Sequence, residues 1–338
     1  MAYDDRMSMD SWFPKADPVA TDMIHRFTFY MEGESDVRFY EKFFKKLRFR
    51  NCGGKGVVLG YREDYLSTGE AEGSDGTECC FCVDRDFDAK VGMDQIDDME
   101  RILFYQLTKR AREGGFNDLE CMQLRSKLVK WTLDLKYGIY GDEADAMLRS
   151  AVKAAAIVGC YRIANRFMKG PSTKDILWQF LDKRDPIEPE RDVGKSEIGP
   201  YLLFKHGAAV VRDGLVEIDE AKLQQVLRQT CGRSYGYGAG RDSDVECAIR
   251  EAGKIRQEIK DGNDIDYCRG HDITYFLCAQ LKSRKGGRGA NNRGMVPNNR
   301  ADLEDKIASV LNNEKIYSEC LKFISGYEFV EKLKEVSG

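Results

Sequence analysis

The segment His25-Arg-Phe-Thr-Phe-Tyr-Met-Glu-Gly-Glu-Ser-Asp36 is an apolar run that stops at acidic residues, and the segment Cys79-Cys-Phe-Cys-Val-Asp-Arg-Asp-Phe-Asp88 repeats this pattern. Each apolar run has the length and composition of a buried β-strand. Glu32, Asp84 and Asp86 therefore stand at predicted strand ends. The carboxyl ends of parallel strands line the crevice where open α/β sheets bind ligands. Together the two segments predict an acidic site at one edge of a parallel sheet.

Two shorter apolar runs, at 57–59 and 102–105, extend the predicted sheet to further strands. After the first strand, Ser35 or Asp36 can cap a helix, because apolar residues recur at helical spacing as far as Leu47. Strands that alternate with helices indicate βαβ units and a mostly parallel sheet. The first part of the chain is therefore predicted to have an α/β fold.

After Asn117 the pattern becomes mainly helical, apart from two short strand-like runs at 208–211 and 215–218. The predicted helices cover 119–135, 142–168, 220–230, 243–260, 271–281, 301–311 and 314–334. A proline-containing, charged stretch at 183–200 is typical of a linker or a long surface loop. The predicted domains are an N-terminal arm (1–20), a catalytic α/β domain (21–135) and a helical domain (136–338) with a flexible basic loop near 282–300.

The composition of the 338 residues is that of a folded globular protein, with 42% hydrophobic and 11% aromatic residues. No apolar stretch approaches the about 18 residues that a membrane-spanning helix needs. The first residues lack the charged-then-apolar pattern of a secretion signal. We read the 11 cysteines as reduced and mostly buried, which indicates a cytoplasmic protein.

The acidic strand ends favour a metal site. Carboxylates packed together repel one another unless a cation or shared protons compensate, and ligand sets made only of oxygen favour Mg²⁺, with Mn²⁺ as the alternative. Residues i and i+2 share one face of an ideal strand, so Asp84 and Asp86 can point at a single ion. The plainer alternatives are a turn for Asp84 and Asp86, and a helix-start charge for Glu32.

In this order, each after a predicted strand, the motifs Glu32-Gly33 and Asp84-Arg-Asp86 resemble the TOPRIM fold of primases, topoisomerases and OLD-family nucleases. Asn117-Asp-Leu-Glu120 and Cys268-Arg-Gly-His-Asp-Ile-Thr274 resemble two further elements of a TOPRIM-like effector family, the AriB-type effectors of the PARIS anti-phage system. The resemblance covers residues 25–125 and, beyond them, one short element. Around 101–116 the chain departs from the family pattern.

The resemblance implies roles for individual residues. Asp84 and Asp86 would hold Mg²⁺, and Glu32 would ligate the metal or act as general acid or base. If Asp118 or Glu120 supplies another ligand, a second ion becomes possible. The same two residues are alternatively helix N-terminal caps. His271 would act beside the catalytic site, with a buried structural histidine as the alternative.

Basic residues suggest contacts with phosphate. Lys55 in Gly53-Gly-Lys-Gly56 would offset charge that develops on a phosphate, although the stretch is wrongly spaced for a Walker A loop. We expect nucleic-acid contacts from two places, a helix after the first strand and the basic loop. The candidate residues are Lys45, Lys46, Arg284, Lys285 and Arg288. A solvated helix face and a disordered linker are the alternatives.

The resemblance implies an antiviral effector: a Mg²⁺-dependent endonuclease that cleaves RNA, in particular tRNA, after release from an AriA-like ATPase sensor. It also implies a toxic, cytoplasmic homodimer. Two alternatives stay open. One is a non-catalytic TOPRIM-like binding or regulatory module, and the other is a stand-alone DNA nuclease.

Overall fold

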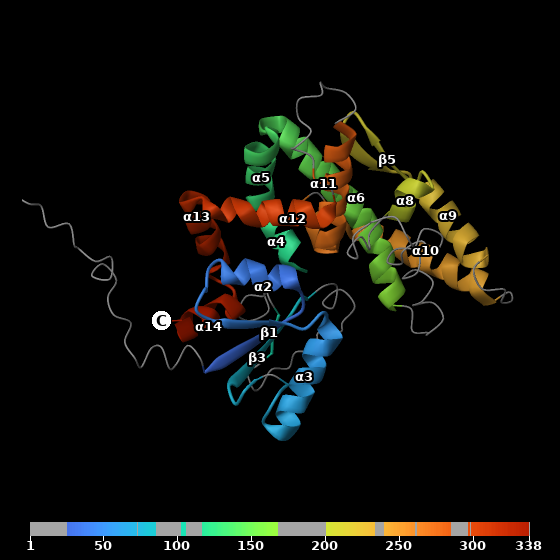
Figure 1. Ribbon diagram of the computed structural model, residues 1–338. Coiled ribbons are helices and arrows are strands. Elements are labelled where there is room, and N and C mark those ends of the chain that lie inside the picture. The colour runs from blue at the N-terminus through green and yellow to red at the C-terminus, as the bar shows by residue number, and fades with distance from the viewer. Residues whose placement is uncertain are drawn as a thin grey trace, which may run out of the picture. The chain divides into compact units, whose positions relative to one another are not determined.

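The computed structural model describes residues 26–72, 74–85, 103–105, 117–167, 201–233, 240–260, 262–284, 297 and 299–337 (Figure 1). The predicted arm, the predicted linker and most of the predicted basic loop lie outside these residues, and so do Asp86, Lys285 and Arg288. The described residues form two compact units, which are treated separately. The sheet unit contains the described residues up to Val83 together with 103–105 and 328–337, and the helical unit contains the others.

The sheet unit is built on a parallel four-stranded sheet with the strand order β2-β1-β3-β4. The strands are β1 (Phe27–Met31), β2 (Arg48–Asn51), β3 (Glu78–Val83) and β4 (Leu103–Tyr105). The predicted strands at the start of the chain, at 79–83 and at 102–105 are confirmed as β1, β3 and β4. The predicted mostly parallel α/β core is confirmed as well.

Helices cover both faces of the sheet, which explains why β1 and β3 are mostly apolar. On one face lie α2 (Glu34–Glu41) and α14 (Glu328–Ser337), and on the other lies α3 (Lys55–Thr68) (Figure 1). The ring of Phe329 on α14 packs 5.9 Å from Phe29 and 5.2 Å from Tyr40. On the α3 face, Tyr30 and Phe81 stack at 5.0 Å. The successive residues Phe29 and Tyr30 of β1 thus bury their side chains on opposite sides of the sheet.

The predicted strand at 57–59 is wrong, because these residues lie inside α3, and the second strand is Arg48–Asn51. Two glycines with positive φ, Gly53 (+80°) and Gly54 (+153°), stand immediately before this helix. The true strand lies at the sheet edge and contains two arginines, so it lacks the apolar run by which buried strands are predicted. The predicted extension of the preceding helix to Leu47 is also wrong, since α2 ends at Glu41.

The helical unit packs around one long helix, α6 (Gly141–Phe167), whose alanine-rich middle is buried. This helix contacts α10 (Gly240–Glu258), α11 (Gly270–Ser283) and a two-stranded hairpin. The hairpin consists of β5 (Ala209–Arg212) and β6 (Leu215–Ile218). The unit also contains the helices α4 (Leu119–Arg125), α5 (Leu128–Tyr137), α8 (Tyr201–Lys205), α9 (Glu220–Arg233), α12 (Arg300–Ser309) and α13 (Glu314–Ile324). The predicted helical character after Asn117 and the two short strands are confirmed.

The compact units divide the chain differently from the continuous domain ranges expected from the sequence. Helices α4 and α5 belong to the helical unit, although the expected catalytic domain includes them. Helix α14 belongs to the sheet unit, because its Phe329 is buried against the sheet. Among the described residues, no helix is both long enough and apolar enough to cross a membrane.

Candidate functional sites

Glu32 follows the last residue of β1, and Asp84 follows the last residue of β3. These strands are adjacent and parallel, and Met31 pairs with Cys82, so the two strands end at the same edge of the sheet within about one residue of each other. Both acidic side chains are half-buried. Topology therefore places the start of both acidic motifs at the carboxyl ends of two neighbouring strands. Asp86 lies outside the described residues.

Lys55 begins helix α3 and reaches the same edge of the sheet unit. Its ammonium nitrogen lies 5.6 Å from the ring centroid of Tyr105, the last residue of β4. Strand β4 is the other neighbour of β3, and Tyr105 pairs with Val83. The sequence predicts that Lys55 offsets charge on a phosphate. The structure places its ammonium group beside the last residue of β4, at the carboxyl end of the sheet.

A second group of predicted residues meets in the helical unit, where the Asn117–Glu120 segment contacts the Cys268–Asp272 segment. The Asn117 amide donates hydrogen bonds to the carbonyl oxygens of Asp266 (3.1 Å) and Cys268 (2.9 Å). Asp118 Oδ2 accepts a hydrogen bond from the backbone N–H of Gly270 at 2.5 Å. Two motifs that are about 150 residues apart are thus joined by hydrogen bonds between side chains of the first and backbone groups of the second.

Asp118 is a buried helix cap. Its Oδ1 accepts a hydrogen bond from the Cys121 N–H at 3.0 Å, at the start of α4. Burial and the nearby charge of Glu120 raise the pKa of Asp118, while the two backbone donors, from Gly270 and Cys121, favour its charged form. Both carboxylate oxygens are therefore engaged by the protein itself, as the helix-cap alternative predicts.

Gly270 permits this close approach. A Cβ atom at position 270 would lie 2.3 Å from Asp118 Oδ1 and 2.4 Å from Glu120 Cβ. Carbon atoms do not approach so closely, so any larger residue would force α4 and α11 apart. The glycine of Gly270-His-Asp272 is thus explained by packing.

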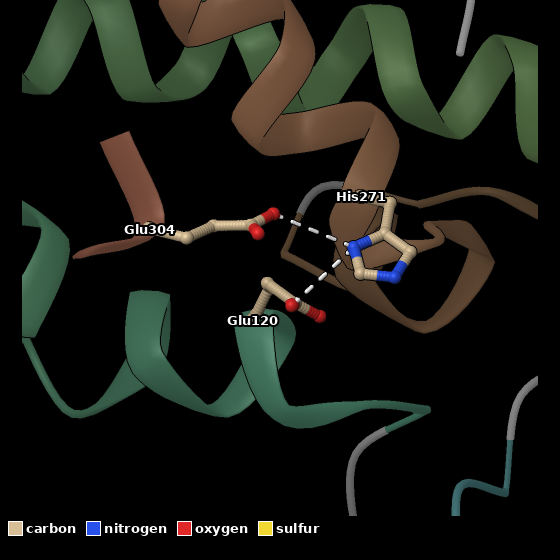
Figure 2. Close-up of side chains that lie close together, drawn as sticks. All are labelled: Glu120, His271 and Glu304. Atoms are coloured by element: carbon tan, nitrogen blue, oxygen red, sulfur yellow. Dashed lines mark ion pairs between the residues drawn. The ribbon is translucent and has the colours of Figure 1, made fainter. Parts of the chain in front are cut away.

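Glu120, His271 and Glu304 come from α4, α11 and α12 and point toward one another (Figure 2). His271 Nδ1 lies 3.3 Å from Glu120 Oε1 and 3.5 Å from Glu304 Oε1. Glu120 is 4% exposed, whereas the His271 side chain is 31% exposed. One ligand atom from each residue lies within 4.8 Å of the others, a spacing that could hold a metal ion.

The charges in this cluster are strongly coupled. Burial alone would lower the pKa of His271, but the contacts with Glu120 and Glu304 outweigh it and raise this pKa to about 10. Burial alone would raise the pKa of Glu120, but His271 and then Arg300 outweigh it and lower that pKa. Without a metal, the arrangement is a protonated histidine between two carboxylates.

Glu304 has further polar neighbours. The Thr274 hydroxyl donates to Glu304 Oε1 at 3.2 Å, and Arg300 Nη1 lies 3.4 Å from the same oxygen. Arg300 and Glu304 occupy one face of α12, one turn apart. Neither residue is predicted from the sequence, because a charged pair at this spacing is common on exposed helix faces and belongs to no recognisable motif.

Asp272 forms a buried ion pair with Arg162 of α6. Arg162 Nε donates to Asp272 Oδ2 at 2.9 Å, and Nη2 donates to Oδ1 at 3.0 Å. Their side chains are only 8% and 1% exposed. This paired geometry fixes the N-terminal turn of α11 against the central helix. Nothing in the sequence singles out Arg162 as the partner.

The predicted nucleic-acid contacts are only partly described. Lys45 and Lys46 are exposed, but they lie in a turn after α2 and not on a helix. Arg284 forms an ion pair with Glu143 and contacts the sulfur of Met147 at 3.6 Å, so its charge is compensated within the chain. Lys285 and Arg288 lie outside the described residues.

Comparison of the chain with protein-family models, with curated proteins and with solved structures gives no significant match. The geometry of the chain's own residues therefore carries the functional argument.

Proposed function

We propose that the chain is a TOPRIM-like nuclease that hydrolyses phosphodiester bonds with the help of Mg²⁺. One observation carries the proposal: Glu32 and Asp84 directly follow two adjacent parallel strands that end at the same edge of the sheet. In open α/β sheets this edge is where ligands bind. The resemblance of Glu32-Gly33 and Asp84-Arg-Asp86 to the TOPRIM pattern supports the choice of reaction.

The residue types at this edge fit a hard divalent cation. Glu32, Asp84 and Asp86 offer only carboxylate oxygens, which Mg²⁺ prefers. Asp84 and Asp86 would hold the ion, which would polarise the phosphate and lower the pKa of a bound water molecule. Glu32 would take the proton from the attacking water or deliver one to the departing oxygen.

Lys55 would offset negative charge on the phosphate. Its ammonium group lies over Tyr105, at the carboxyl end of the strand next to β3. A fixed cation at this edge stabilises charge that develops during in-line displacement, and in a partly buried site it does so more strongly than in water.

The proposal extends to substrate and partner through the resemblance alone. RNA, in particular tRNA, is the proposed substrate, and an ATPase sensor would restrain the nuclease until infection. A cytoplasmic homodimer is proposed on the same ground. Cleavage assays with tRNA, other RNA and DNA, in the presence and absence of Mg²⁺, distinguish these substrates.

The test replaces each carboxylate by its amide, in the variants Glu32→Gln and Asp84→Asn. Each substitution keeps the size of the side chain and removes its charge, so the fold is expected to persist. We expect Mg²⁺-dependent cleavage to fall about 10²- to 10⁴-fold, the usual contribution of a general acid or base. The measurement is the cleavage rate, with circular dichroism and the melting temperature as checks of folding.

Glu63→Gln is the matched control, because Glu63 is an exposed glutamate on α3, within the same unit. This variant should cleave like the unmodified chain. Full activity in Glu32→Gln would refute the assignment of Glu32. If the unmodified chain shows no Mg²⁺-dependent cleavage of any nucleic acid, the alternative of a non-catalytic TOPRIM-like binding or regulatory module replaces the nuclease.

A further inference from the structure

The helical unit contains a three-residue cluster that the chemistry proposed for the sheet edge does not use, although the resemblance implies a metal-ligand role for Glu120 and a role beside the catalytic site for His271. Glu120 and His271 belong to segments that resemble the effector family, whereas Glu304 belongs to neither segment. The three residues lie on three different helices, and their ligand atoms converge in Figure 2. None of them belongs to the sheet unit.

The distances fit a shared ion better than they fit hydrogen bonds. A charge-assisted N–H···O bond is about 2.7–2.9 Å long, whereas His271 Nδ1 lies 3.3 Å and 3.5 Å from the two carboxylate oxygens. Nδ1 is buried, and neither contact has hydrogen-bond geometry. Two ligands of a tetrahedral ion with bonds of about 2.1 Å stand about 3.4 Å apart. The two separations from His271 Nδ1 match this tetrahedral edge, and the three ligand atoms lie within 4.8 Å of one another.

The donor set indicates the class of ion. One imidazole nitrogen and two carboxylate oxygens suit Zn²⁺ or Mn²⁺, whereas Mg²⁺ and Ca²⁺ prefer oxygen alone. Two carboxylates face the histidine nitrogen, which suits a divalent cation, and Arg300 Nη1 lies 3.4 Å from Glu304 Oε1. The His271 side chain is 31% exposed, whereas its Nδ1 is buried between the two carboxylates.

We propose that Glu120, His271 and Glu304 bind a divalent transition-metal ion of the Zn²⁺ or Mn²⁺ class, with water as the fourth ligand. The ion ties α4, α11 and α12 together at the point where Gly270 and Asp118 already join the first two of these helices. The site uses none of Glu32, Lys55, Asp84 and Asp86, so it can be tested separately from the proposed nuclease function.

The experiment titrates the metal-free, full-length chain with Zn²⁺ and with Mn²⁺. We expect one equivalent of Zn²⁺ to bind this cluster and the melting temperature to rise. Mn²⁺ can also enter the proposed sheet-edge site, so its binding to the cluster is measured in Asp84→Asn. Loss of a residue that only supports a metal ligand lowers metal affinity about 10- to 100-fold. Glu304→Gln and His271→Gln each remove a ligand, so each should lower the affinity for Zn²⁺ by more than that. Asp305→Asn is the matched control, since Asp305 is exposed and adjacent on the same helix, and it should bind normally.

Co²⁺ added to the unmodified chain provides a readout that needs no variant. Absorption bands of tetrahedral nitrogen and oxygen coordination would support the site even if a variant fails to fold. An intense thiolate charge-transfer band would instead place the ion on the cysteines and overturn the proposal. Absence of binding, or equal affinity in Glu304→Gln and in the unmodified chain, would also overturn it and leave the protonated His271 ion pair in its place. Glu32→Gln should bind Zn²⁺ normally, which separates this result from a failure of the nuclease assignment.

Discussion

The edge of the sheet and the helical cluster both gather acidic residues, but they do so in different physical ways. At the sheet edge, Glu32 and Asp84 are half-buried and directly follow two adjacent parallel strands. In the helical cluster, Asp118 and Asp272 are buried and bonded to backbone or arginine donors. The comparison teaches that Asp118 and Asp272 hold helices together, whereas Glu32 and Asp84 stand at the strand ends where open α/β sheets bind ligands.

The two regions should respond differently to substitution, in the cleavage rate and in the free energy of unfolding. Amide substitutions at the sheet edge should reduce cleavage and leave the free energy of unfolding almost unchanged. Substitutions that break the contacts of Asp272, Asp118 and Gly270 should reduce the free energy of unfolding of the helical unit. A sheet-edge variant that mainly loses stability, or a variant of Asp272, Asp118 or Gly270 that keeps full stability, would contradict this difference between the two regions.

The largest loss of stability is expected from Asp272→Ala. The substitution leaves the Arg162 guanidinium buried without its carboxylate, and breaking such a pair from one side costs about 3–5 kcal/mol. The measurement is the free energy of unfolding from urea titration. Asp145→Asn is the control, because the Lys130–Asp145 pair joins α5 to the same central helix but is more than a third exposed. That variant should lose at most about 1 kcal/mol.

Asp118→Ala should be next in size, at about 2–4 kcal/mol. It removes the helix cap, worth about 0.5–2 kcal/mol, and leaves the buried Gly270 N–H without its acceptor, at about 1–3 kcal/mol. Asp118→Ser separates the two parts, because serine still caps α4 but is too short to reach Gly270. A serine variant as unstable as the alanine variant would assign the whole loss to the bond with Gly270.

Gly270→Ala should cost about 1–3 kcal/mol through overpacking. The added methyl group would collide with Asp118 and Glu120, neither of which can withdraw from the contact without breaking a bond or a packed interface. Gly253→Ala is the control, because a Cβ atom at position 253, also within a helix, meets no atom within 4 Å. An unchanged melting temperature in Gly270→Ala would show that α4 and α11 are not held at this distance in solution.

The same contrast explains how much the sequence could predict. The strand ends of the sheet were predictable because an apolar run and the acidic residue after it are local features, as in Phe27–Met31 followed by Glu32. Strand Arg48–Asn51 was not, since an edge strand with two arginines lacks an apolar run. Arg162 and Glu304 were beyond prediction, because their partners lie 110 and about 30 residues away. Only the packing of helices brings such residues together.

The smallest stability effect is expected from Lys55→Met, which sharpens the comparison at the sheet edge. Methionine keeps the apolar stem over Tyr105 and removes only the charge, so the loss is about 0.5–1 kcal/mol. If Lys55 offsets phosphate charge, cleavage should nevertheless fall about 10-fold or more, with a larger effect on kcat than on KM. Lys315→Met, an exposed lysine at the start of α13, controls for the loss of general positive charge. Equal cleavage by the two variants would leave Lys55 as a lysine that only packs on a tyrosine ring.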